Sequence, residues 1–414
     1  MIDNARYAVA VVLVVACNAV AQIPDPSAQP TFLERAESQQ EAGITISVAV
    51  PSADETRTFF GVPLYRRKIQ PVWLEIVNDR EAPIMFLPVG MDPRYFTSIE
   101  SAFLGAGGAK KADAAMRKSF LDRKIDMPIQ PGERRSGFMF TQLEQGTKSF
   151  NVDIRTNDDQ IVGFTFFVPV PGLRLDHQDV DWDTLYPADE LQDLDRAELI
   201  EALRNMPCCT TDKKTKGSGD PLNLVVIGDV DDVYYSFIRA GWDETEVISA
   251  ASLTKMAGAF VRRSEYKTSP VSGLYVFGRT QDVALQKARD NIDERNHLRL
   301  WMSPLRYEGV PVWIGQISRD IGVRLTKKTI TTHKIDPDVD ETREYLVENL
   351  AYSQSLAKLG YVAGVGAAPI DAPRANLTGD PYITDGLRVV LWVASQPTDI
   401  GDIEDLDWGS RPVR

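Results

Sequence analysis

Short runs in which apolar and polar residues alternate dominate the chain between residues 44 and 168. Ile44, Ile46, Val48 and Val50 alternate with small or polar residues, the period of two that buries one face of a β-strand. The same pattern predicts further strands at 72–77, 84–87, 137–140, 150–154 and 163–168. The first half of the chain is therefore predicted to be all-β.

Turn-forming residues separate the second and third of these runs. Asn78, Asp79 and Pro83 lie between them and predict a hairpin. Between residues 93 and 124 the spacing becomes that of an amphipathic helix, interrupted in the middle by Gly-Ala-Gly-Gly-Ala. About six or seven short strands joined by turns are typical of a sandwich. We therefore expect an immunoglobulin-like β-sandwich with a helical insertion over residues 43–175.

The pattern changes after residue 206, where strands and helices alternate. Apolar runs predict strands at 222–228, 273–278, 297–301, 310–317 and 388–394. Helical spacing predicts helices at 230–241, at 253–263 and from Pro337 to about Leu359, with Gly241 ending the first of them. This alternation indicates a C-terminal α/β domain with a mixed sheet over residues 206–395.

The N-terminus has the features of an export signal. Arg6 precedes nine apolar residues, Ala8 to Ala16, which is far short of the roughly 20 residues that a membrane-spanning helix needs. Val14-Val15-Ala16-Cys17 has the form of a lipoprotein processing site, which predicts a signal peptide over 1–16 and lipidation of Cys17. The alternative is ordinary cleavage after Ala21. We favour a protein exported to the periplasm and lipid-anchored to a bacterial membrane.

The remaining segments are predicted from their composition. Residues 17–42 are rich in Pro, Gln and Ser and suit a flexible tether. Residues 176–205 form an acidic linker that leads into a helix, and residues 396–414 are predicted to be a disordered acidic tail. With about 150 residues per domain, a chain of 414 residues is expected to hold two folded units.

The net charge limits the class of partner. The chain has 59 acidic and 46 basic residues, which gives −13 at pH 7. Nucleic acid is therefore not an expected partner, because phosphate binding needs clustered positive charge. The lipid anchor predicts association with the membrane, and an envelope lipid or protein is the expected partner.

Two of the three histidines lie in the most distinctive local sequences. His297 alternates along a predicted strand with Leu298, close to Arg299, and His333 is followed by an acidic run. If both imidazoles converge with a carboxylate of Asp336, Asp340 or Asp320, they form a site for Zn²⁺ or a similar divalent ion with an open position for water.

The same groups have other interpretations. Without a metal, the histidines could act as general acid and base, with Arg299 or Arg343 neutralising an anionic substrate. The alternative for His297 is a structural histidine within the core, and Asp336 before Pro337 is an expected helix N-cap. Both possibilities remain open at this point.

Cys208 and Cys209 are adjacent in the sequence. In an oxidising envelope they form a vicinal disulfide, pair with another chain or remain buried thiols. Their spacing does not match a zinc site.

Several dispersed motifs resemble those of one family. These are 207–211 (PCCTT), 219–223 (GDPLN), 240–242 (AGW), 269–272 (SPVS), 281–282 (QD), 295–299 (RNHLR), 312–315 (VWIG) and 333–343 (HKIDPDVDETR). Together they resemble the LssY-type C-terminal domain of bacterial envelope proteins, over about residues 206–394. The resemblance implies no firm activity. Some relatives are fused to membrane-embedded phosphatases of the phosphatidic-acid type, which associates the domain with lipid or phosphate chemistry.

Two hypotheses follow for function. In the first, the protein is a hydrolase, with or without a metal, that acts on a phosphorylated or lipid-linked envelope substrate through His297 and His333. In the second, it is a non-catalytic envelope lipoprotein that binds or scaffolds a partner. Convergence of the two histidines around one pocket would favour the enzyme.

Overall fold

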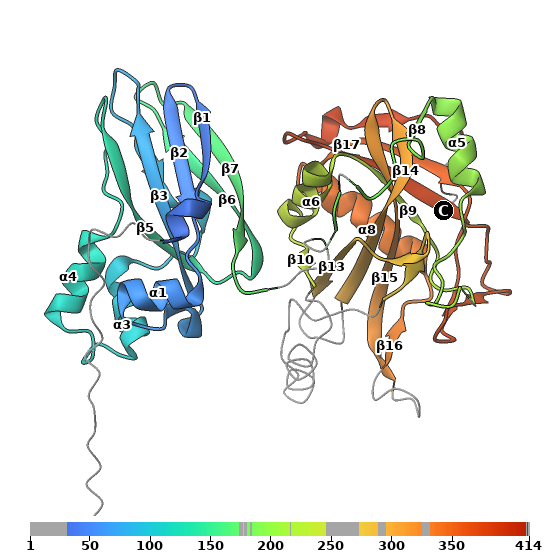
Figure 1. Ribbon diagram of the computed structural model, residues 1–414, viewed down its shortest axis with the longest axis horizontal. Helices are drawn as coiled ribbons and strands as arrows, with labels where there is room; N and C mark the ends of the chain where they lie inside the picture. Colours follow the sequence, from blue (N-terminus) through green and yellow to red (C-terminus); the bar gives the residue numbers. More distant parts are fainter. Residues whose placement is uncertain are drawn as a thin grey trace, which may run out of the picture.

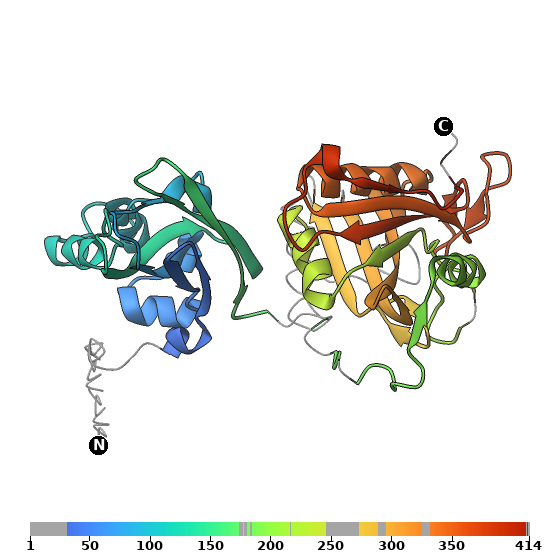
Figure 2. The ribbon, with the colours of Figure 1, turned by 90° about the horizontal axis from the view of Figure 1, so that it is seen from above.

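The computed structural model describes residues 31–173, 177, 180–182, 184–215, 217–245, 273–288, 295–324, 332–410 and 412. In these residues the protein is mostly β, with seven α-helices. Antiparallel sheets occupy the N-terminal region and a large mixed sheet the C-terminal region, and the two regions lie side by side (Figures 1 and 2). The predicted signal peptide, Cys17, the predicted helix at 253–263 and the motif at 269–272 fall outside the described residues.

Two antiparallel sheets make up the N-terminal region. The first has the order β1–β2–β3–β5 and the second the order β4–β6–β7. Their bounds are β1 (Glu37–Glu41), β2 (Ile44–Ala49), β3 (Ile69–Asn78), β5 (Arg134–Gln142), β4 (Met85–Leu87), β6 (Gly146–Arg155) and β7 (Ile161–Val170). Both sheets contribute side chains to one core, for example Ile46 and Leu74 from the first and Val152 and Phe166 from the second.

The predicted strands are present, but the predicted hairpin between β3 and β4 is wrong. β3 pairs with β2 and β5, whereas β4 pairs with β6 in the other sheet. Asn78 explains the crossing, because its side chain donates to the carbonyls of Ala82 and Ile129 and so directs the chain toward the second sheet.

Helices close one end of the first sheet. They are α1 (Ala53–Phe60), α2 (Pro88–Met91), α3 (Ser98–Ala106) and α4 (Ala114–Asp122), with the short 3₁₀ helices η1 (Thr31–Arg35) and η2 (Leu64–Arg67). α3 ends at Gly107, in the glycine-rich segment that the sequence marked as an interruption. The helices surround an aromatic cluster that includes Phe60, Phe120 and Phe138.

The predicted tether is too long at its C-terminal end. Residues 31–41 form η1 and β1 rather than a flexible segment. Phe32 is 2% exposed, and its ring contacts those of Phe59, Trp73 and Phe138. Burial of one large aromatic side chain is enough to order a segment that is otherwise polar.

The C-terminal region is built on a ten-stranded mixed sheet. Its main order is β10–β13–β14–β15–β9–β20–β17–β21, with β16 paired to β15 and β8 paired to β14. Their bounds are β10 (Asp243–Glu244), β13 (Val283–Ala288), β14 (Arg295–Tyr307), β15 (Val310–Arg324), β9 (Leu224–Ile227), β20 (Leu387–Val393), β17 (Leu356–Ala363), β21 (Glu404–Leu406), β16 (Thr332–Ile335) and β8 (Gln192–Leu194). Two short hairpins complete it, β11 (Tyr275–Val276) with β12 (Arg279–Thr280), and β18 (Arg374–Ala375) with β19 (Pro381–Tyr382).

Helices cover both faces of this sheet. α6 (Val230–Arg239) and α8 (Val339–Tyr352) pack on the face that carries Leu224 and Leu391. α5 (Arg196–Asn205) packs on the opposite face, beside Val225 and Val390. The four residues of β9 are fully buried between these layers, which explains the unbroken apolar run at 222–228.

Three predicted boundaries are wrong in this region. The helix predicted at the end of the segment 176–205 is present as α5, but the acidic linker before it contains β8, which pairs with β14 of the large sheet. The helix predicted to reach Leu359 ends at Tyr352, because residues 356–363 form β17 and pair with β20. The predicted disordered tail contains β21, and Trp408 is buried against Tyr307.

Within the described residues, no helix has the length and apolar character to cross a membrane.

Candidate functional site

Alternating side chains of β14 divide between the core and a buried polar face. Leu298 and Leu300 pack against α6 and α8. Arg295, His297 and Arg299 occupy the alternate positions, where successive side chains of a strand point to the opposite side. All three are buried, although charged and polar groups are costly to bury without partners.

His297 contacts a carboxylate from the neighbouring strand. Its Nε2 lies 2.5 Å from Oδ2 of Asp320 on β15. The direct partner of His297 in the antiparallel ladder is Ser318, so Asp320 lies two residues further along and reaches the ring diagonally. Asp320 also lies 3.7 Å from Nε of Arg295, which ties the carboxylate to two groups of β14.

Burial lowers the pKa of His297 well below its usual range, and the charges of Arg295 and Arg299 lower it further. The Asp320 carboxylate acts in the opposite direction, but burial and two guanidinium groups dominate, so the ring is neutral at pH 7. In a neutral ring that donates Nε2–H to Asp320, the basic lone pair is on Nδ1. This is the arrangement of an oriented general base.

Glutamines on the adjacent strands hold the two arginines. Nη1 of Arg295 donates to Gln286 of β13 over 2.7 Å, and Nη1 of Arg299 donates to Gln316 of β15 over 2.9 Å. Gln316 in turn donates to Oγ of Ser318 over 2.8 Å. The resulting buried polar face contains Gln286, Arg295, His297, Arg299, Gln316, Ser318 and Asp320, from three neighbouring strands.

A loop before β9 brings a further carboxylate toward this face. Burial raises the pKa of Asp220, while a hydrogen bond from Asn376 and the charge of Arg299 lower it, and Asp320 and Asp380 raise it. Asp220 is therefore within the electrostatic field of the polar face. Nδ2 of Asn376 donates to Oδ1 of Asp220 over 2.8 Å.

The same loop contains the disulfide between Cys208 and Cys209. Of the alternatives open for these cysteines, the structure forms the vicinal disulfide. Arg388, which is fully buried, fixes the loop by donating to four carbonyls, those of Leu222, Met206, Pro207 and Gly364. Burial lowers the pKa of Arg388 to about 10.

Residues 201–387 match the family model of the LssY C-terminus. Over this region the chain is similar to the LssY C-terminus. The match covers a little under half of the chain and includes the disulfide and the whole buried polar face, but none of the N-terminal sheets. No curated protein and no solved structure matches the chain.

The two histidines of the matched region, His297 and His333, are not brought together by strand pairing. His333 lies on β16 opposite Val323 of β15, whereas His297 lies opposite Ser318. Ser318 and Val323 are five residues apart on β15. At about 3.3 Å per residue, the backbone positions opposite the two histidines are roughly 16 Å apart along this strand. The backbone thus gives His297 a partner in Asp320 rather than in His333, whose side chain lies outside the described part of the structure.

Asp336 is in the turn between β16 and α8, and it is not the N-cap. The N-cap of α8 is Asp338, whose Oδ1 accepts the backbone N–H groups of Asp340 and Glu341. Asp336 instead accepts the N–H of Asp338. Pro337 separates the two acids, so the helix begins two residues later than the sequence predicted.

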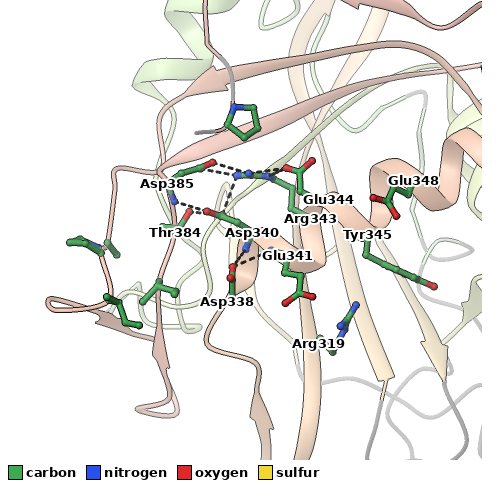
Figure 3. A pocket seen from close by; sticks show the side chains of 15 residues that line it. Arg319, Asp338, Asp340, Glu341, Arg343, Glu344, Tyr345, Glu348, Thr384 and Asp385 are labelled. Carbon is green, nitrogen blue, oxygen red and sulfur yellow. Dashed lines mark hydrogen bonds and ion pairs between the residues drawn. The ribbon is translucent and has the colours of Figure 1, made fainter. Parts of the chain in front are cut away.

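Asp340 and Arg343 belong to a separate network around α8 (Figure 3). Arg343 forms a two-pronged ion pair with Asp385, both N–O distances being 2.9 Å, and also contacts Glu344 at 2.9 Å and Asp340 at 3.1 Å. These contacts raise the pKa of Arg343 against the effect of burial. The guanidinium is thus paired with three carboxylates of the chain.

A hollow of about 640 Å³ adjoins this network. Its lining includes the carboxylates of Asp338, Glu341, Glu344 and Glu348, which Figure 3 shows along α8. An acidic hollow of this kind does not suit an anionic substrate. The predicted site residues therefore divide, with His297 and Arg299 in the buried polar face and Asp340 and Arg343 at α8.

No group of three or more His, Cys, Asp or Glu side chains suited to a metal ion occurs within the described ranges. The predicted zinc site at His297, His333 and Asp336 includes the side chain of His333, which lies outside the described part of the structure, and it stays a prediction. The contact that the structure does form, His297 with Asp320, supplies one imidazole and one carboxylate.

Sequence analysis missed Gln286, Gln316 and Ser318 as members of the polar face, and Asp385 as the partner of Arg343. A signal for part of this set was present. Gln316, Ser318 and Asp320 alternate with Ile317 and Arg319, the same period of two that marked His297. Two consecutive strands that each place polar residues on one buried face predict a polar site between them.

Proposed function

We propose that the LssY-like C-terminal domain is a hydrolase that acts on a phosphorylated or lipid-linked envelope substrate, with His297 as general base. The contact of His297 with Asp320, beside the guanidinium groups of Arg295 and Arg299, carries the proposal. A base oriented by a carboxylate is the arrangement that activates water or a hydroxyl group. Planar guanidinium groups match the oxygens of a phosphate.

The chemistry requires no group beyond water and the side chains of this face. Nδ1 of His297 takes a proton from a water molecule, and the hydroxide attacks phosphorus. The ester P–O bond breaks, and the imidazolium returns the proton to the leaving oxygen. Asp320 accepts the hydrogen bond from Nε2–H throughout and, remaining ionised, stabilises the transient positive charge on the ring.

Gln286 and Gln316 would fix the direction of Arg295 and Arg299. Each glutamine oxygen accepts one N–H of a guanidinium group, and a guanidinium group has five N–H donors. The fixed orientation reduces the conformational entropy lost when the guanidinium group binds an anion.

We further propose that the protein is an exported lipoprotein, anchored through Cys17 and located in the periplasm. The disulfide between Cys208 and Cys209 supports an oxidising compartment. In this proposal the N-terminal region is a separate domain, immunoglobulin-like in having two antiparallel sheets around one core but with its own strand order, and it spaces the catalytic domain from the membrane.

The test uses the full chain in detergent, with a phosphomonoester, a phosphodiester and phosphatidic acid as substrates. We expect the His297→Asn variant to lose activity by about 100-fold or more, the usual effect of removing a general base. Asp320→Asn should lose less, and the exposed Asp122→Asn should match wild type. Unchanged hydrolysis by His297→Asn, with its circular dichroism intact, would eliminate the proposal.

The metal-assisted form of the proposal has its own experiment. Zinc content is measured for the wild-type protein and for His333→Ala. Stoichiometric zinc that is lost in the variant would support metal-assisted hydrolysis. Equal, near-zero zinc in both proteins would leave the metal-free reaction at His297.

A second candidate function is non-catalytic binding of an envelope partner. Two observations favour it: His297 is 6% exposed, and a buried histidine can serve the core alone, and strand pairing does not bring His297 and His333 together as convergence on one pocket would require. Absence of hydrolysis of all three substrates by the wild-type protein would favour this binder over the enzyme.

A further inference from the structure

A cavity of about 190 Å³ lies between the two regions of the chain. The N-terminal region contributes residues of β6 and β7, and the C-terminal region contributes the start of α6 and positions on β13 and β15. Figures 1 and 2 both show α6 on the side of the C-terminal region that faces the N-terminal sheets. The buried polar face and the hollow at α8 have no residue in its lining.

Six aromatic side chains line this cavity. They are Phe167, His177, Trp182, Tyr234, Tyr235 and Trp313. Phe167 stacks on Tyr235 with ring centroids 4.2 Å apart, and His177 lies 4.5 Å from Tyr234. Trp182 and Trp313 contact each other at 5.3 Å. The walls are thus almost continuous aromatic surface, supplemented by Val230, Val233 and Val283.

The charge at the cavity is negative. Burial lowers the pKa of His177 to about 4, so this ring is neutral. Among the described residues of the lining, Asp231 is therefore the charged one at neutral pH. Burial raises the pKa of Asp232 at the start of α6, and repulsion from the carboxylates of Asp229 and Asp231 raises it further, against the opposing charge of Arg239. A bound cation would offset this repulsion.

Aromatic faces attract cations, and this set of rings already does so within the chain. The guanidinium carbon of Arg239 lies 5.7 Å from the ring centroid of Phe167. A metal ion would need several oxygen ligands, whereas Asp231 is the one carboxylate among the described lining residues and most of the lining is aromatic or aliphatic. A methylated ammonium needs no acceptor and gains from aromatic contact.

From these observations we propose that the cavity binds a quaternary ammonium group, held by the aromatic rings and by the carboxylate of Asp231. A volume of about 190 Å³ suits a headgroup rather than a larger molecule. The group can come from a soluble trimethylammonium compound or from the headgroup of a lipid. Because the cavity is shared by both regions, its occupant also bridges them.

The test measures binding of choline to the full chain by calorimetry, with 3,3-dimethylbutan-1-ol as the uncharged analogue of the same shape. We expect choline to bind and the analogue to bind at least 10-fold more weakly, because only the charged form gains from the rings and Asp231. Equal affinity for the two compounds, or no heat with either, would overturn the proposal.

Variants assign the binding to this cavity. Trp182→Ala and Asp231→Asn should each weaken choline binding by about 5- to 30-fold, in the range of a desolvated cation–π contact, whereas the exposed Asp402→Asn should leave it unchanged. Unaltered binding in both cavity variants would place choline elsewhere and refute the site. The comparison of choline with its uncharged analogue uses wild-type protein alone. It can therefore refute the proposal even if a cavity variant fails to fold.

A vesicle assay identifies the source of the group. Full chain is mixed with vesicles of phosphatidylcholine or of phosphatidylglycerol, in the presence and absence of free choline. Phosphatidylcholine-selective binding that free choline competes away supports a lipid headgroup as ligand. Choline binding without vesicle selectivity supports a soluble ligand.

Discussion

His297 on β14 and Asp320 on β15 are joined from Nε2 to Oδ2 at 2.5 Å, across a diagonal of the antiparallel ladder. Neither residue is near the other in sequence, and both are buried. The pair therefore depends on the register of two long strands. Any change that shifts this register would separate the ring from its carboxylate.

Replacing Asp320 is expected to destabilise the protein even if the site has no catalytic role. Asp320→Ala leaves the buried Nε2–H of His297 without its acceptor, which costs about 1–3 kcal/mol. Asp320→Asn keeps an acceptor oxygen and should cost less. Urea unfolding measures both, with Asp122→Asn, an exposed carboxylate, as the control. Asp320→Ala as stable as wild type would contradict this expectation.

Arg343 is expected to be a stability residue. Arg343→Met removes the partner of Asp385 and leaves a partly buried carboxylate, with an expected loss of about 3–5 kcal/mol. The double variant with Asp385→Leu should lose less than the sum of the two single variants, because the residues are directly coupled.

The control for Arg343 is Lys118→Met, which breaks an exposed ion pair with Asp122 and should change stability by about 0.5 kcal/mol or less. Additive effects of Arg343→Met and Asp385→Leu would show that the two-pronged ion pair contributes no net coupling.

Glu244 predicts a pH dependence of stability. It is 2% exposed and accepts hydrogen bonds from the backbone N–H and the hydroxyl of Thr147, on β6 of the other region. Burial raises the pKa of Glu244 from its ordinary value of 4.5 to about 7. Between these values the folded protein retains a proton that the unfolded chain has lost. Stability should therefore fall as the pH rises from about 4.5 to 7, by up to about 3 kcal/mol, and level off above 7.

The measurement is urea unfolding of wild type and Glu244→Gln at several pH values between 4.5 and 8. The glutamine does not titrate, so the difference between the two proteins should increase with pH across this window. Parallel curves for the two proteins would refute the raised pKa.

Gly386 and Gly379 form a matched pair for backbone strain. Both have positive φ, +87° and +80°, but a Cβ on Gly386 would lie 2.5 Å from the backbone N of Ala367, whereas a Cβ on Gly379 has nothing within 4 Å. Gly379→Ala should cost about 1 kcal/mol for the left-handed conformation alone. Gly386→Ala should cost clearly more, as thermal unfolding would reveal. Equal costs would show that the backbone at Ala367 moves readily to make room for the added Cβ.

Alternation along the chain was sufficient to predict β2, β5, β6 and β7, and an unbroken apolar run predicted β20, because each of these strands has one or both faces in a core. It could not predict β1, whose residues are all polar and mostly exposed. β1 exists because it pairs with β2, which is a tertiary effect. The end of α8 was missed for a related reason: the residues of β17 gain their partner, β20, from a distant segment.

The candidate site was predicted in part. The sequence marked His297 and Arg299, and it named Asp320 as one of three possible carboxylates. It did not show that Asp320 rather than Asp336 or Asp340 is the partner, since that choice follows from the strand register. Arg343 looked equally suited to a substrate until its carboxylate partners, Asp385 above all, were visible in the fold.

The middle strand of the large sheet, β9, is bordered by β15 and β20, and both come much later in the chain. Asn223, beside β9, bonds to Ile317 across 94 residues, and Leu222 is held by Arg388 across 166. A nascent chain thus carries an apolar strand with two unpaired edges until β15 has been synthesised, and with one unpaired edge until β20 follows. A premature stop codon just ahead of β20 would not yield a shorter working domain but an aggregation-prone product, and a chaperone that shields β9 would matter most during this interval.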